Sequence, residues 1–264
     1  DLPFAAMNGE VQMDPIDQQN RMIAYAQEQL AQLFEKESVA WEPLVSIGHT
    51  ADEISRIVDK KQIDLAISAT HGRSGLKRLL LGSVTERLMR TLSCPLLIIR
   101  DGEDAQAGTK ATAFPPSRIL VGCDFSSDSG LAFQYGLAMA QEFEAELHLV
   151  HVVEPPEYQN VLVTEDTAGK RYRESILEQL TDKLARMVPP EARNWCDLTT
   201  TLREGKPDEE LTRYAEVNDV DLIVLGIRGH GLVESLFIGS TTDRVARRAP
   251  CPVLSVKPMT GRAK

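Results

Sequence analysis

The sequence is poor in several features that identify common classes of protein. None of its apolar runs approaches the ~20 residues that span a bilayer, and its start, DLPFAAMNGE, lacks the basic and apolar regions of a signal peptide. Its four cysteines show no CxxC spacing, which disfavours a zinc or redox motif. Basic residues number 29 against 39 acidic ones, a net charge of -10. We therefore expect a cytoplasmic protein that binds neither nucleic acid nor membranes.

The chain contains an internal repeat. At 264 residues it is about twice the ~100 to 150 residues of a typical domain. Over the 53 positions from 48 to 100, 15 residues are identical to those 157 positions later, and no gap is needed. The identical pairs include Gly48 and Gly205, Asp64 and Asp221, Gly72 and Gly229, Gly82 and Gly239, Ser83 and Ser240, and Cys94 and Cys251. This self-similarity predicts two homologous domains in tandem.

The second repeat, residues 117–258, alternates apolar strands with helices. The expected strands are 118–125, 145–153, 198–205, 221–226 and 251–257, and the expected helices are 130–144, 172–187, a helix opened by Pro207, and 240–248. Such alternation is typical of an α/β domain with a doubly wound parallel sheet. Residues 101–116 are small, polar and proline-containing, and we interpret them as the linker between the domains.

The first repeat, residues 1–100, has the same pattern only from its middle onwards. We expect helices at 16–36, 51–60 and 83–92 and strands at 41–48, 64–69 and 95–100. The first strand, first helix and second strand have no counterpart, and the missing first strand is the central one of a doubly wound sheet. We therefore expect about 40 further upstream residues in the native protein. The alternative is a degenerate first half that another chain completes.

A glycine pattern follows the strand 221–226. Gly226, Gly229 and Gly239 are separated by two and nine residues, and Ser240 comes next. Glycine lets the backbone approach a ligand closely, and a helix that begins at Ser240 offers free N–H groups to a phosphate. The pattern is therefore consistent with a nucleotide site. It is equally consistent with a structural turn followed by a capped helix.

Asp124 ends the first strand of the second repeat. In a doubly wound sheet the ends of strands one and four flank the crevice in which ligands bind, so this carboxylate would face the base or ribose of a nucleotide. The alternative is an aspartate that only initiates the following turn. Its coincidence with the glycine loop favours the ligand-binding interpretation.

Residues 117–258 resemble a universal stress protein domain. The family pattern G-x2-G-x9-G-[S/T] is matched by Gly226, Gly229, Gly239 and Ser240, and VGCDFS, LVHVVE and APCPVL resemble its other landmarks. The resemblance implies a Rossmann-like fold of the adenine nucleotide alpha hydrolase type. It also implies that the last strands, PLLIIR and PVLSVK, pair within one chain as a pseudo-dimer, which leaves a monomer or a homodimer of such chains open. The ATP-binding residues that it implies are Asp124, Val152, Gly226, Gly229, Gly239, Ser240 and Thr241.

The first repeat departs from the family pattern. Ala69 stands where Gly226 stands in the second repeat, so a methyl group would lie close to a ribose. The counterpart of Asp124 falls before the first residue. Gly72, Gly82 and Ser83 remain and predict at most a weaker anion site.

The sequence offers no catalytic constellation. We find no Ser-His-Asp set, carboxylate pair or phosphoryl-transfer lysine in these loops, and no metal site. The leading hypothesis is an ATP-binding regulatory or stress-response protein, with ATP bound alone or with Mg²⁺ and at most slow hydrolysis. The alternative is an ATP-independent tandem scaffold whose glycine loops are structural. An adenylyl transferase is disfavoured because the HxGH and SGGxDS motifs are absent.

Overall fold

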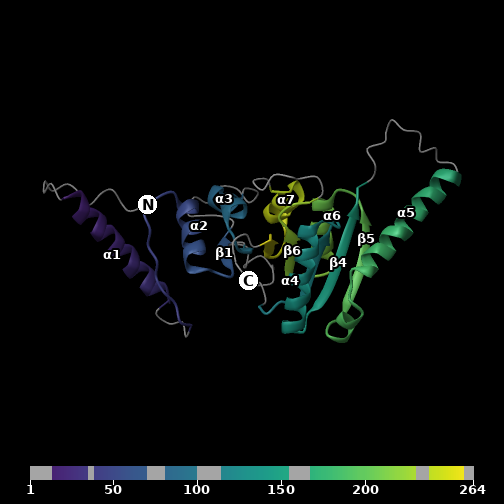
Figure 1. Ribbon diagram of the computed structural model, residues 1–264, viewed down its shortest axis with the longest axis horizontal. Helices are drawn as coiled ribbons and strands as arrows, with labels where there is room; N and C mark the ends of the chain where they lie inside the picture. The colour runs from purple at the N-terminus through teal and green to yellow at the C-terminus, as the bar shows by residue number, and fades with distance from the viewer. Residues whose placement is uncertain are drawn as a thin grey trace. The chain divides into compact units, whose positions relative to one another are not determined.

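The computed structural model describes residues 14–34, 39–69, 81–99, 114–154, 167–229 and 238–258 (Figure 1). The chain divides into two compact units, Asp1–Glu53 and Ile54–Lys264. The first unit holds α1 (Pro15–Phe34) and the start of α2 (Thr50–Lys61). The second holds β1 (Ala66–Ala69), α3 (Ser83–Thr91), β2 (Leu96–Ile99), β3 (Arg118–Cys123), α4 (Ser127–Phe143), β4 (Glu146–Val153), α5 (Thr167–Arg186), a 3-10 turn (Pro190–Asn194), β5 (Leu198–Glu204), α6 (Pro207–Val217), β6 (Leu222–Gly226), α7 (Ser240–Arg248) and β7 (Val253–Val256).

The predicted strand 41–48 is wrong. Residues 41–47 carry no regular secondary structure, whereas the corresponding segment of the second repeat forms β5. β5 exists because it pairs with β4 along its whole length. The described part of the first repeat contains no counterpart of β4, so the backbone groups of 41–47 have no neighbouring strand to bond. The turn after this segment is nevertheless repeated, since Gly48 and Gly205 have φ of +154° and +144°.

The second unit is built on one seven-stranded sheet. Its order is β1-β2-β7-β6-β3-β4-β5, and all neighbours are parallel except β2 and β7. The five strands of the second repeat have the doubly wound order, with β3 in the centre between β4 and β6. The predicted α/β class and parallel sheet are therefore confirmed. No helix in the described part of the chain is long and apolar enough to cross a membrane.

The two repeats meet through β2 and β7. These strands pair antiparallel, with Leu97 opposite Leu254, as expected for PLLIIR and PVLSVK. Two polar contacts reinforce the junction: the Arg247 guanidinium lies 3.4 Å from the Glu86 carboxylate of α3, and the Lys257 ammonium donates to the carbonyl of Arg90 over 3.2 Å. The last part of the first repeat thus belongs to the sheet of the second.

Helices cover both faces of the sheet of the second repeat. On one face α4 and α5 bury Val121, Leu147 and Leu149, which are 0% exposed. On the other face α6 and α7 bury Leu120, Val150 and Ile223. Side chains of successive strand residues point to opposite faces, so β3 and β4 supply both cores with near-continuous apolar runs.

Two glycines of α4 test this packing. A Cβ on Gly136 would lie 2.4 Å from Cγ2 of Val121, whereas a Cβ on Gly130 would meet nothing within 4 Å. We expect Gly136→Ala to lower the free energy of unfolding by about 1–3 kcal/mol through overpacking. Gly130→Ala should raise it by about 0.5–1 kcal/mol, because alanine favours helix. Urea unfolding of both variants measures the difference, and equal stabilities would contradict the proposed α4–β3 contact.

Candidate functional site

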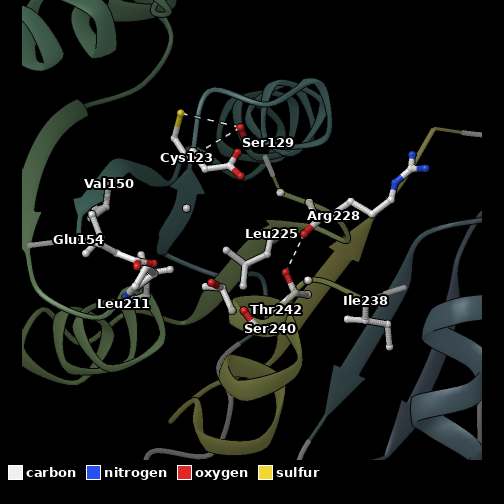
Figure 2. A pocket seen from close by; sticks show the side chains of 18 residues that line it. Cys123, Ser129, Val150, Glu154, Leu211, Leu225, Arg228, Ile238, Ser240 and Thr242 are labelled. Carbon is white, nitrogen blue, oxygen red and sulfur yellow. Dashed lines mark hydrogen bonds between the residues drawn. The ribbon is translucent and has the colours of Figure 1, made fainter. Parts of the chain in front are cut away.

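A cavity opens where the parallel strands of the second repeat end. Its volume is about 530 Å³, and it lies at the carboxyl ends of β3, β4 and β6 and the start of α7. All seven residues that the family resemblance implied line it: Asp124, Val152, Gly226, Gly229, Gly239, Ser240 and Thr241. Figure 2 shows Val150, Leu211 and Glu154 on one side and Ser240 and Thr242 on another, with Leu225 between them.

The floor of the cavity is apolar and was not predicted. Val150, Leu211 and Leu225 line it together with Gly122, which lies within β3. A Cβ on Gly122 would lie 2.4 Å from Leu225 and 3.2 Å from Leu211. The missing side chain therefore lets these two leucines close over β3. A glycine inside an apolar strand is the sequence signal for such a close approach.

Asp124 makes a turn and also faces the cavity. Its Oδ1 accepts from the backbone N–H of Ser126 at 3.0 Å, and its own N–H donates to Oγ of Ser129 at 3.3 Å. Ser126 in turn caps α4. The aspartate therefore shapes the turn, as the alternative interpretation expected, and it also lines the cavity. Its other oxygen, Oδ2, points towards Gly229, since a Cβ there would lie 2.6 Å from it.

Val152 presents backbone groups rather than its side chain alone. The carbonyl of Val153 accepts from Gly205 at 3.1 Å, so that residue bonds on the β5 side. Successive residues of a parallel strand bond to opposite neighbours, which turns the N–H and C=O of Val152 towards the β3 side. The ladder with β3 ends at the Cys123–His151 pair. That pairing uses the N–H of Val152 as donor to the carbonyl of Cys123, so the carbonyl of Val152 is the backbone group that remains at the cavity.

Gly226 is required by packing against α4. A Cβ there would lie 2.6 Å from the carbonyl carbon of Asp128 and 2.7 Å from its oxygen. The motif did not reveal this packing reason for the glycine, which also lines the cavity. Ala69 holds the same place in β1, and the described residues of the first repeat contain no counterpart of α4 for its methyl group to meet.

The start of α7 forms another end of the cavity. Gly239 is the residue before the helix, with φ -60° and ψ 137°, and its N–H donates to the carbonyl of Ile227. Ser240 and Thr241 follow, where the first N–H groups of a helix have no intrahelical partner. In the first repeat Gly82 has nearly the same conformation before Ser83 and α3, with φ -60° and ψ 142°. Gly72, the third member of that predicted anion site, lies outside the described residues.

Thr242 is a site residue that the motif analysis missed. It is 4% exposed, and its Oγ1 donates to the carbonyl of Gly226 at 2.7 Å (Figure 2). The same bond occurs in the first repeat, where Thr85 donates to Ala69 at 2.8 Å. Each bond ties the start of a helix to the end of a strand. Identity of these two threonines at the repeat offset was the signal available in the sequence.

Three charged side chains line the described part of the cavity. Arg228 is positively charged, and Asp124 and Glu154 are negatively charged. The guanidinium of Arg228 is bound by the Asp128 carboxylate, with Nε 2.9 Å from Oδ2 and Nη2 3.2 Å from Oδ1. This hydrogen-bonded pair raises the pKa of Arg228. Because Asp128 is only 3% exposed, the guanidinium neutralises a buried charge and attaches the glycine loop to α4.

Cys123, His148 and His151, which lie near the cavity, are at least partly buried and make structural contacts. Burial raises the pKa of the Cys123 thiol, which keeps it protonated and unreactive. Burial also lowers the pKa of His148 and of His151. His148 lies 2.8 Å from the hydroxyl of Tyr214 on the α6 face, while His151 lies beside Phe125 on the opposite face. The two side chains therefore lie on opposite faces of the sheet.

Comparison with known proteins assigns the fold to one family. The model of the "Universal stress protein family" matches residues 3–100 and 116–257. A universal stress protein of Methanocaldococcus jannaschii is 30% identical over 161 residues, which cover 61% of this chain and 87% of that protein. One from Thermus aquaticus is 34% identical over 140 residues, 53% of this chain and 97% of that protein. The crystal structure of a universal stress protein from Archaeoglobus fulgidus covers 96% of this chain and 84% of its own at 23% identity and a TM-score of 0.64.

The hydrogen bond from Thr242 to the Gly226 carbonyl should contribute to the free energy of unfolding. Thr242→Val keeps the shape of the side chain but leaves the Gly226 carbonyl without its 2.7 Å donor. We expect the free energy of unfolding to fall by about 1–3 kcal/mol. Thr85→Val, which removes the equivalent bond from the first repeat, is the matched variant and should leave the cavity of the second repeat unchanged. Denaturant unfolding measures both, and a loss below about 0.5 kcal/mol for Thr242→Val contradicts the assigned role.

Proposed function

Since the chain belongs to the universal stress protein family, we propose that it is a regulatory protein of the stress response that binds an adenine nucleotide in its second repeat. The observation that carries the proposal is that all seven residues named from the sequence line the same cavity. Its volume of about 530 Å³ suits a ligand of nucleotide size. Occupancy of the cavity would set the conformation or the partner choice of the protein.

The parts of the cavity match the parts of ATP. The apolar floor of Val150, Leu211 and Leu225 suits the base, and the carbonyl of Val152 offers it an acceptor. Asp124 lies where a ribose hydroxyl can donate to it. The start of α7 provides N–H groups and the positive end of a helix dipole for phosphates.

A metal ion would reach this site with the nucleotide. In the described part of the chain no three His, Cys, Asp or Glu side chains gather into a metal site. Mg²⁺ prefers phosphate oxygens, water and one or two carboxylates, so the phosphates would carry it, with Asp124 or Glu154 nearby. The described lining residues include no lysine, which supports at most slow ATP hydrolysis.

A second candidate function is an ATP-independent scaffold. Two contacts favour it: Gly226 packs against the backbone of Asp128, and Thr242 donates a hydrogen bond to the Gly226 carbonyl. Both give the glycine motif a structural purpose without a ligand. In this alternative the two repeats serve as a rigid interaction module, and the cavity carries no signal.

Nucleotide binding separates the two candidates. Acid denaturation of the purified protein followed by mass spectrometry identifies any nucleotide that it carries, and calorimetry with ATP, ADP and AMP, with and without Mg²⁺, measures affinity. We expect about one ATP per chain. Gly229→Ala should weaken binding about tenfold or more, because its Cβ would lie 2.6 Å from Oδ2 of Asp124.

The matched control is Gly130→Ala, whose Cβ meets nothing within 4 Å and which should bind ATP like the wild type. Equal loss of binding in the two variants would assign the effect to stability rather than to the site. No released nucleotide and no heat at millimolar ATP would reject the proposed function and favour the scaffold.

A further inference from the structure

The chain leaves β3 through an unusual backbone conformation. Phe125 has φ +62°, in the left-handed region that bulky side chains rarely adopt. It stands between Asp124, which faces the cavity, and Ser126, which caps α4. Unfavourable conformations of this kind persist only where surrounding contacts enforce them, and they concentrate at ligand sites.

Contacts on the far side of the sheet enforce this conformation. The Phe125 ring lies 4.5 Å from the ring of His151 between centroids, and the Lys183 ammonium of α5 lies 4.1 Å from the Phe125 centroid. His151 Nδ1 lies 2.7 Å from the carbonyl of Cys123; since a carbonyl can only accept, Nδ1 carries the proton and donates. We call these three side chains, Phe125, His151 and Lys183, the rear stack.

The rear stack adjoins the turn that orients Asp124. His151 fixes the last carbonyl of β3, and the N–H of Phe125 donates to Sγ of Cys123 at 3.4 Å. The next N–H, that of Ser126, then reaches Oδ1 of Asp124 at 3.0 Å. Rotation of the backbone at Phe125 would move this N–H and release the carboxylate from its place opposite Gly229.

We propose that His151 and Phe125 are positioning residues, which hold the Asp124 carboxylate towards the cavity from the opposite face of the sheet. This inference rests on the proposed function in so far as Asp124 contacts the nucleoside part of the ligand. Neither positioning side chain touches the ligand. Their effect therefore concerns the base and ribose and not the phosphates, which the start of α7 would hold.

The test compares two substitutions of His151. Asparagine places an amide N–H near the position of Nδ1 and can still donate to the Cys123 carbonyl, whereas leucine has a similar size and no donor. We expect His151→Leu to weaken adenosine binding about tenfold and His151→Asn to restore it to within about threefold of wild type. Affinity for inorganic tripolyphosphate should be the same in all three proteins.

A second readout needs no ligand. The amide proton of Ser126 is bonded to Asp124, and we expect its hydrogen exchange, followed by NMR, to be at least about tenfold faster in His151→Leu and in Phe125→Leu than in wild type or His151→Asn. His148→Leu is the matched control, because it removes a buried histidine from the other face of β4. It should change thermal stability but neither adenosine affinity nor the Ser126 amide.

The outcomes separate this inference from the proposed function. Wild-type adenosine affinity together with slow Ser126 exchange in both leucine variants overturns the positioning role. Equal losses of adenosine and tripolyphosphate affinity would show general damage and also overturn it. If the wild type binds no nucleoside, the proposed function fails. The Ser126 exchange rates then decide alone whether the rear stack holds Asp124.

Discussion

The site depends on the pairing of β3 with β4 on one side and with β6 on the other. Because the three strands are parallel, their carboxyl ends meet at one edge of the sheet, and residues far apart in the chain, such as Asp124, Val152 and Gly226, line one crevice. Side chains alternate along each strand, so Asp124, Val150 and Val152 line the cavity, whereas Val121, Leu147 and Leu149 pack under α4 and α5.

The described lining of the cavity offers a negatively charged ligand backbone groups rather than an uncommitted cationic side chain. The guanidinium of Arg228 is committed to the buried Asp128 carboxylate, and the other charged side chains that line the described part of the cavity are acidic. An anion would therefore be bound chiefly by the N–H groups at the start of α7 and by the helix dipole. Many of the turn's polar groups are already bonded to one another before a ligand arrives, which lowers the conformational cost of binding.

Local patterns in the sequence predicted most elements, and long-range contacts account for the failures. The run 118–123 forms β3 and Ser240–Arg248 forms α7 as expected, because an apolar strand and the glycine and serine at the start of a helix are local sequence patterns. Residues 41–48 have an equally suitable pattern, but the described residues of the first repeat include no counterpart of β4 for them to pair with. Asp128 is about 100 positions before Gly226, so no motif could show that the glycine accommodates its carbonyl. The role of Thr242 was visible only through its repeat partner, Thr85.

The antiparallel junction of β2 and β7 also affects how the protein can change over evolutionary time. Where two identical subunits join at such an edge, their association depends on concentration and every substitution appears twice. Here both strands belong to one polypeptide, so the junction forms at a fixed, high effective concentration at any dilution. The difference between Ala69 in the first repeat and Gly226 in the second affects one half only. The tandem arrangement therefore permits one repeat to keep a ligand cavity while the other is selected for a different task.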